Sequence, residues 1–131
     1  GLGDVYKRQF HNWSLTGEGG ARFENMIAGH LLKNAQAWTD CALGEFELYY
    51  LRDKQKREVD FLLTKDAKPY LLLEVKSNQS EPTKSLDYFN RMLKPKFCIQ
   101  LVRDKIKERK KLMSHPKIQI LEAKRFLSAL N

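Results

Sequence analysis

The stretch Glu58–Ser77, with the sequence EVDFLLTKDAKPYLLLEVKS, decides the fold of this chain. Its two ends, Glu58–Thr64 and Tyr70–Ser77, are rich in apolar and strand-forming residues, so each predicts a β-strand. Between them, Lys65–Pro69 predicts a five-residue hairpin loop. Leu71–Leu73 is uninterruptedly apolar, as in strands that are buried on both faces. The stretch therefore predicts a hairpin whose second strand lies near the middle of a sheet.

Further elements are expected on both sides of this hairpin. Apolar residues recur every four positions between Ala21 and Trp38, which predicts a helix, and the aromatic-rich segment 46–52 predicts a strand. After the hairpin we expect a helix between Pro82 and Pro95, strands over 96–102 and 117–121, an ambiguous basic segment over 103–113, and a helix over 123–130. The order α-β-β-β-α-β-(α)-β-α predicts the α/β class, in its mixed α+β form, with a central mixed sheet flanked by helices.

The length of 131 residues fits one domain. We expect an N-terminal arm over 1–19 and a single domain over 20–131. The first nine residues, GLGDVYKRQ, resemble a recurrent spurious end-translation of sequence fragments, so they are excluded from the fold prediction. We accordingly expect the natural protein to extend further towards its N-terminus. The alternative is that these residues are a genuine terminal arm.

The composition excludes several classes of protein. Hydrophobic residues make up 42% of the chain, enough for a packed core, and no apolar run approaches the roughly 20 residues of a membrane-spanning helix. Two cysteines, Cys41 and Cys98, are too few for a disulfide scaffold, so we expect free thiols in a cytoplasmic protein. The 24 basic and 16 acidic residues give a net charge of +8, which suggests a polyanionic partner.

Three charged residues of the hairpin are expected to converge. Closing the hairpin about Ala67 places Thr64 opposite Tyr70 and Asp60 opposite Glu74. Directly opposed residues share a face of the sheet, so Asp60, Glu74 and Lys76 are predicted on one face. The same alternation places Val59 and Phe61 together on the other face.

Two carboxylates and an amine at this spacing suit metal-assisted chemistry. Two unpaired neighbouring carboxylates repel each other, and a divalent cation removes the conflict. Mg²⁺ takes oxygen ligands, usually one or two carboxylates with waters and a substrate phosphate. A lysine beside the metal can orient an attacking water or neutralise the charge that builds up on phosphorus. These parts predict metal-assisted phosphodiester hydrolysis, with Mg²⁺ or Mn²⁺ as the cofactor.

The acid-x-Lys triplet alone carries little information. It occurs four times in the chain, beginning at Asp66, Glu74, Glu108 and Glu122. Only the triplet at Glu74 ends a buried apolar strand, where a charge is costly without a purpose. The structural alternative is an ion-paired site in which Lys76 neutralises the two acids.

The segments Phe23-Glu24-Asn25, Glu58-Val59-Asp60-Phe61 and Glu74-Val75-Lys76-Ser77 together resemble the PD-(D/E)XK nuclease superfamily. Within it, the chain resembles the C-terminal domain called domain of unknown function 4143, over roughly Gly20–Asn131. The resemblance implies Asp60 and Glu74 as Mg²⁺ ligands and Lys76 as the catalytic lysine. It also implies Glu24 as a further acid near the metal, so that Glu24 joins the catalytic and the metal-binding sets. The sequence departs from the oldest superfamily pattern because Val59, not Pro, precedes Asp60.

The resemblance further implies that this domain follows an AAA+-type ATPase domain in the parent polypeptide. No Gly-rich phosphate loop with Lys-Ser/Thr occurs, so we expect no nucleotide site within this fragment. A basic segment can follow a phosphate backbone, although a plain solvated helix face is equally consistent with it. Its candidate nucleic-acid-binding residues are Arg103, Lys105, Lys107, Arg109, Lys110 and Lys111.

We therefore expect a Mg²⁺-dependent nuclease-like domain whose partners are DNA and the ATPase domain of the parent chain, with no membrane association. The alternative is a catalytically inactive nucleic-acid-binding or protein-interaction domain of that ATPase. The sequence does not fix the oligomeric state.

Overall fold

A computed structural model describes residues 5–9, 19–79, 81–104 and 117–130 of the chain. The strands are β1 (Val5–Gln9), β2 (Phe46–Asp53), β3 (Glu58–Lys65), β4 (Lys68–Lys76), β5 (Phe97–Val102) and β6 (Gln119–Glu122). The helices are α1 (Gly19–Asp40), α2 (Lys84–Leu93) and α3 (Ala123–Leu130). Among these described residues, no helix is both long and apolar enough to cross a membrane.

The six strands form one mixed sheet in the order β1-β2-β3-β4-β5-β6. Strands β1 to β4 pair antiparallel, whereas β4 with β5 and β5 with β6 pair parallel. Helix α2 connects β4 to β5, as a parallel pair requires. Strand β4 is therefore the strand at which the sheet changes from antiparallel to parallel pairing.

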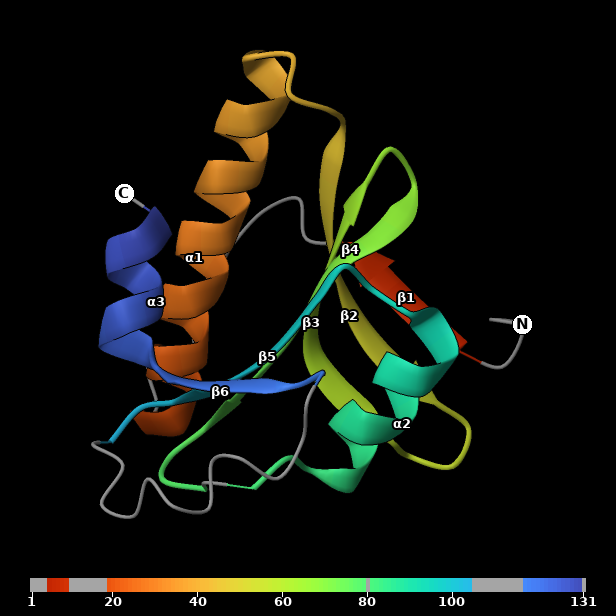
Figure 1. Ribbon diagram of the computed structural model, residues 1–131, viewed down its shortest axis with the longest axis vertical. Helices are drawn as coiled ribbons and strands as arrows, with labels where there is room; N and C mark the ends of the chain where they lie inside the picture. Colours follow the sequence, from red (N-terminus) through yellow and green to blue (C-terminus); the bar gives the residue numbers. More distant parts are fainter. Residues whose placement is uncertain (1–4, 10–18, 80, 105–116, 131) are drawn as a thin grey trace.

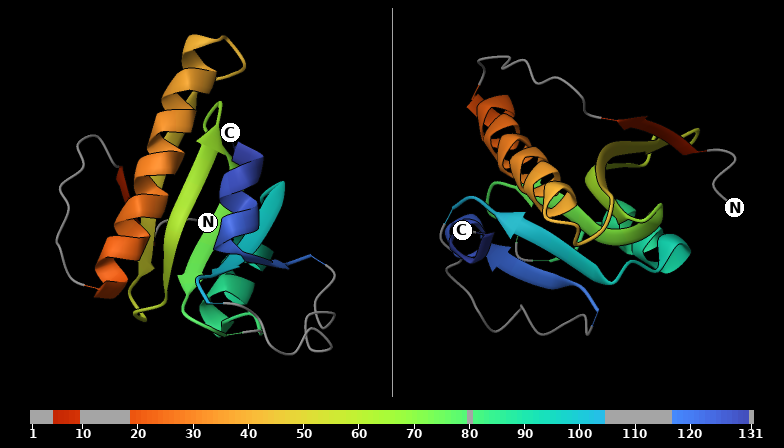
Figure 2. Two further views of the ribbon diagram at one scale, coloured as in Figure 1. Left: turned by 90° about the vertical axis from the view of Figure 1, so that its left-hand side faces the viewer. Right: turned by 90° about the horizontal axis from the view of Figure 1, so that it is seen from above.

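Helices cover both faces of the sheet. Helices α1 and α3 pack on one face and α2 packs on the other (Figures 1 and 2). Two hydrophobic cores result, one on each face. The α1-side core contains Ile27, Leu31, Leu48, Phe61, Leu63, Leu71, Leu73, Val75, Leu101 and Phe126, among others. The α2-side core contains Leu51, Val59, Leu62, Leu72, Leu86, Phe89, Cys98 and Ile118.

The predicted fold class is confirmed. Leu71, Leu72 and Leu73 alternate between the two cores, so the apolar run is buried on both faces of a central strand, as predicted. Strand β1 was not predicted, because residues 1–19 were set aside as an arm, and the structure pairs it with the edge of β2. Most of the ambiguous segment 103–113 lies outside the described residues.

The hairpin differs from the prediction at its turn. The pairs Phe61 with Leu73 and Leu63 with Leu71 confirm closure about position 67. Beyond them the register shifts, so that Thr64 faces Pro69 instead of Tyr70. The expected five-residue loop is a tight turn at Asp66 and Ala67, whose φ angles of 51° and 64° are both positive. Two successive positive φ angles match a two-residue hairpin turn, and the sequence lacks the glycine that normally marks one.

Strand β3 carries an extra residue beside Asp60. Tyr49 and Leu51, two positions apart on β2, face Leu62 and Val59, which are three positions apart on β3. Consequently Val59 packs in the α2-side core and Phe61 in the α1-side core. The prediction that these two share a face is wrong, because a β-bulge interrupts the alternation.

Candidate metal-binding and catalytic site

The four predicted site residues meet at one edge of the sheet, around the end of β4. Asp60 comes from the bulge in β3, and Glu74 and Lys76 are the seventh and ninth residues of β4. Glu24 comes from the first turns of α1, and its charge acts on all three of the others. Because β4, β5 and β6 run parallel, this is the edge where their C-terminal ends lie together. In open α/β sheets, ligands generally bind at such an edge.

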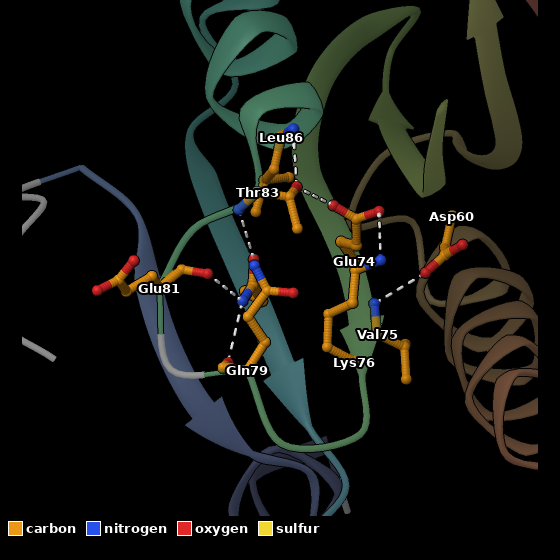
Figure 3. Close-up of polar contacts among 9 residues, drawn as sticks. Asp60, Glu74, Val75, Lys76, Gln79, Glu81, Thr83 and Leu86 are labelled. Carbon is orange, nitrogen blue, oxygen red and sulfur yellow. Dashed lines mark hydrogen bonds and ion pairs between the residues drawn. The ribbon is translucent and has the colours of Figure 1, made fainter. Parts of the chain in front are cut away.

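Asp60 lies against the backbone of β4. Its Oδ2 accepts a hydrogen bond of 2.8 Å from the Val75 N–H, and Figure 3 shows its carboxylate beside that amide. Burial raises the pKa of Asp60 to about 7, and the charges of Glu24 and Glu74 add to the increase. The Val75 N–H and the Lys76 ammonium oppose this increase. Asp60 is therefore a carboxyl whose charge the surrounding protein only partly compensates.

Glu74 is the most enclosed of the acids, with 5% of its surface exposed. The Thr83 hydroxyl donates a hydrogen bond to its Oε2, and the Lys76 Nζ lies 3.9 Å from its Oε1 (Figure 3). Burial raises its pKa, while Thr83 and Lys76 lower it. Glu74 is therefore held by Thr83 and Lys76, whereas Asp60 is held by the Val75 N–H.

Glu24 is the outlying acid of the group. Much of its surface is exposed, yet partial burial raises its pKa, and Lys76 lowers it. The Lys76 ammonium thus acts on Glu24, Asp60 and Glu74 together. It is the cation that balances three neighbouring acids.

Two further residues organise this edge and were not identified from the sequence. Thr83 is the N-cap of α2, where its hydroxyl accepts a hydrogen bond of 3.1 Å from the Leu86 N–H while donating to Glu74. Gln100 has no exposed surface, and its Oε1 accepts from the Thr83 N–H at 3.0 Å. Its Nε2 donates to the carbonyls of Gln79 and Glu81. Threonine before a helix and a lone amide in an apolar strand are signals that were available in the sequence.

The site residues lie within a region of the chain that matches a protein family. A family model described as Domain of unknown function (DUF4143) matches residues 19–121, which include all four site residues. The chain belongs to this family. No curated protein and no solved structure matches it. The DUF4143 assignment confirms that part of the resemblance seen in the sequence.

Of the candidate nucleic-acid-binding residues of this DUF4143 domain, only Arg103 lies within the described part of the chain. The Arg103 N–H donates to the Lys76 carbonyl at 2.9 Å, so Arg103 follows β5 directly beside the site, and its side chain pairs with Asp104 at 3.3 Å. The other candidate nucleic-acid-binding residues, Lys105, Lys107, Arg109, Lys110 and Lys111, lie outside the described residues. Glu58 pairs with Arg52 at 3.3 Å.

The donors at this edge of the DUF4143 domain suit a magnesium ion in type and partly in arrangement. Carboxylate oxygens are the ligands that Mg²⁺ prefers, and one or two of them with waters are its usual set. Asp60 and Glu74 supply two such carboxylates next to each other on the hairpin. Within the described part of the chain, no group of three or more His, Cys, Asp or Glu side chains lies close enough to hold one ion. Of the three predicted ligands, no more than two can therefore share one ion in this arrangement.

Proposed function

We propose that this chain is a Mg²⁺-dependent nuclease-like domain of the PD-(D/E)XK superfamily that hydrolyses phosphodiester bonds in DNA. We further propose that it forms the C-terminal part of an AAA+-type ATP-binding protein of the cytoplasm. Its free thiols, Cys41 and Cys98, are compatible with that compartment. The observation that supports the activity best is the position of Asp60. Its carboxylate sits in a strand bulge against β4, between two other acids and one lysine.

The chemistry of the site supports a charged substrate and a cation together. A buried carboxyl beside two other acids is stabilised by a positive ligand, and bulges are enriched next to active sites. Asp60 and Glu74 would hold the metal, which would polarise the phosphate and activate a water. The Lys76 ammonium would orient the water or offset charge on the phosphate oxygens. Glu24 would orient outer waters from α1.

The activity is tested with matched substitutions in the same two strands. Asp60→Asn and Lys76→Met remove one carboxylate and one ammonium from the site with little change of size. Asp66→Asn and Lys68→Met make the same two changes at the other end of the hairpin, where Asp66-Ala67-Lys68 is another acid-x-Lys triplet. With Mg²⁺ or Mn²⁺ present, the parent and the two control variants should cleave DNA, and the two site variants should lose at least about 100-fold of that rate.

Metal binding gives a readout that does not need cleavage. Mg²⁺ should raise the midpoint of thermal unfolding of the parent and of Asp66→Asn, and leave Asp60→Asn unchanged. A preparation that cleaves neither DNA nor RNA with either metal, and whose midpoint ignores both, would contradict the proposal.

The second candidate is a catalytically inactive binding or interaction domain of the same ATPase. It is favoured by the way in which the charged groups already satisfy one another: Glu74 is held by Thr83 and Lys76, and Asp60 by the Val75 N–H. Under this alternative, Lys76→Met should destabilise the fold because it leaves two buried acids without their cation. Nucleic-acid binding that needs no metal and survives Asp60→Asn would favour it over the nuclease.

A further inference from the structure

Two uncharged residues beside the acids, Thr83 and Gln100, belong to one continuous chain of hydrogen bonds that ends on Glu74 (Figure 3). Gln100 is the residue of β5 that pairs with Glu74 in the register of the two strands, and it has no exposed surface. A buried amide is costly unless its polar atoms are bonded. The contacts of Gln100 therefore indicate what this amide holds in place.

Gln100 fixes the loop that carries Thr83. Its Nε2 donates to the carbonyls of Gln79 at 3.1 Å and Glu81 at 2.7 Å, and its Oε1 accepts the Thr83 N–H at 3.0 Å. An amide nitrogen only donates and an amide oxygen only accepts, so these three bonds allow a single orientation of the side-chain amide. The loop between β4 and α2 is thus tied to β5 by a group that cannot reverse without losing all three bonds.

The hydroxyl of Thr83 has two defined roles. Its Oγ1 accepts the Leu86 N–H at 3.1 Å, which caps α2, and its proton is donated to the Oε2 of Glu74. A hydroxyl has a single proton, and the capping bond occupies one of its lone pairs. The chain of bonds that begins at Gln100 therefore ends at one particular oxygen of the Glu74 carboxylate.

The two oxygens of Glu74 consequently differ in their surroundings. Oε2 is bonded to Thr83, whereas the Lys76 Nζ lies 3.9 Å from Oε1, which is longer than a hydrogen bond. Oε1 therefore keeps lone pairs that can bind a ligand. Fixing the carboxylate through Oε2 also reduces the side-chain freedom that would be lost when Oε1 binds an ion.

Helix capping alone does not require the bond to Glu74. Gly caps helices about as well as Thr, and ionised Asp caps them at least as well, yet neither carries a side-chain proton to donate. The chain also contains a threonine with a purely structural pair of bonds. The Thr39 hydroxyl donates to the Ala35 carbonyl at 2.8 Å and accepts the Phe46 N–H at 2.9 Å. Thr83 differs because its donated bond goes to an acid of the candidate site.

We propose that Thr83, held by Gln100, is a positioning residue for the metal ligand Glu74: it holds Oε2, so that Oε1 is the oxygen left to bind the cation. This inference rests on the proposed function, because it needs a cation at Glu74. Removing a hydrogen-bond partner of a metal ligand typically lowers metal affinity about 10- to 100-fold. Loss of the Thr83 hydroxyl should therefore weaken metal binding by at least about tenfold.

Binding of Mn²⁺ to the full chain, without nucleic acid, tests the proposal. Electron paramagnetic resonance measures the free ion, so the assay needs no cleavage. Thr83→Val, and Thr83→Gly with its adequate helix cap, should bind Mn²⁺ at least about tenfold more weakly, and Thr83→Ser should stay within about twofold of the parent. Thr39→Val removes a hydroxyl that also donates one bond and accepts one, at the other end of α1 from Glu24, and should stay within about twofold.

Gln100→Leu tests whether Gln100 acts through Thr83. If it does, the double variant Gln100→Leu with Thr83→Val should bind Mn²⁺ no more weakly than Thr83→Val alone, because the two losses share one cause. The link is also measurable without metal. The Thr83 amide proton should exchange with solvent at least about tenfold faster in Gln100→Leu, because its acceptor is lost.

Equal losses in Thr83→Val and Thr39→Val, or an unchanged affinity in both Thr83→Val and Thr83→Gly, would overturn the proposal. Additive losses in the double variant would overturn the part assigned to Gln100. Asp60→Asn separates these results from the proposed function. If it abolishes Mn²⁺ binding while the Thr83 variants bind normally, the metal site stands and only the positioning role fails. If the parent binds neither Mn²⁺ nor Mg²⁺, the proposed function fails and the positioning role fails with it.

Discussion

Replacing Asp60 with Asn should make the protein more stable, by an amount that grows as the pH rises from about 4 to about 7. Burial, followed by the charges of Glu24 and Glu74, raises the pKa of this carboxyl from its ordinary value of 3.8 to about 7. The amide of Asn keeps the shape and an oxygen that can accept the 2.8 Å hydrogen bond from the Val75 N–H. The substitution therefore removes only the negative charge of Asp60, which is costly to bury at this site.

The direction of the pH dependence follows from proton linkage. Between about pH 4 and pH 7 the folded protein holds a proton on Asp60 that the unfolded chain has lost, so stability falls as pH rises through this range. Above pH 7 both states are ionised and the full cost of burying the charge remains. Asp60→Asn does not titrate, so its advantage over the parent grows from pH 5 to pH 7 and then stays constant.

The size of the effect can be bounded from the same values. From pH 5 to pH 7 the parent loses about 1.4 kcal/mol for each pH unit, which gives a ceiling of about 2.7 kcal/mol. Asp60 is partly exposed, so water screens some of the cost. We therefore expect the advantage of Asp60→Asn in the free energy of unfolding to grow by about 1 to 2 kcal/mol between pH 5 and pH 8.

Urea denaturation of both proteins at pH 5 and pH 8, without divalent metal, measures this difference. Asp66→Asn, which makes the same chemical change at an exposed carboxyl in the β3–β4 turn, is the control. If Asp60→Asn is less stable than the parent at pH 8, or if its effect does not depend on pH, Asp60 is a paired structural acid. The argument for a charge held ready for a metal then fails.

Three further substitutions test how the acidic edge and its supporting turns are built. Thr83→Val should lower the free energy of unfolding by about 1 to 2 kcal/mol, because it removes the helix cap and the bond to Glu74, and Thr83→Ser should restore most of it in urea titrations. Gln100→Leu should cost about 1 to 3 kcal/mol by calorimetry, because three backbone groups lose their bonds to the buried amide, and a neutral result would show that water replaces the amide. Gly44→Ala should cost about 1 to 3 kcal/mol, because φ is +144°, a backbone conformation that residues with a side chain rarely adopt. Unchanged thermal unfolding of this last variant would mean that the turn relaxes at no cost.

The sequence was sufficient for the elements from α1 onward because each has a strong local signal, whereas β1 was missed. Helix α3 begins and ends at the predicted residues, and the alternating burial of Leu71 to Leu73 follows directly from an apolar run in a central strand. The tight turn at Asp66 and Ala67 was missed because neither residue is a glycine, so its two positive φ angles have no compositional marker.

The sequence predicted that Asp60, Glu74 and Lys76 lie near one another, but it did not predict the geometry of the strands that carry them. Strand alternation correctly placed Lys76 beside Glu74. It failed in β3, where a single extra residue makes the side chains of Val59 and Phe61 point to different faces of the sheet. A bulge arises from how two strands pair, and it leaves no trace in the sequence of one of them. Thr83 and Gln100 could be found as a cap and a buried amide, but their partners become known only once the loop between β4 and α2 is folded.

The placement of charge in this fold follows from where the sheet changes its pairing. At β4 the chain leaves the antiparallel hairpin and enters a parallel crossover, so the ends of β4 and β5 and the start of α2 must lie at one edge. Acids at that edge face the positive end of the α2 dipole, and lysines at the far end face its negative end. The two ends of one helix thus meet charges of opposite sign, Glu74 at the N-cap Thr83 and Lys94 at the C-cap.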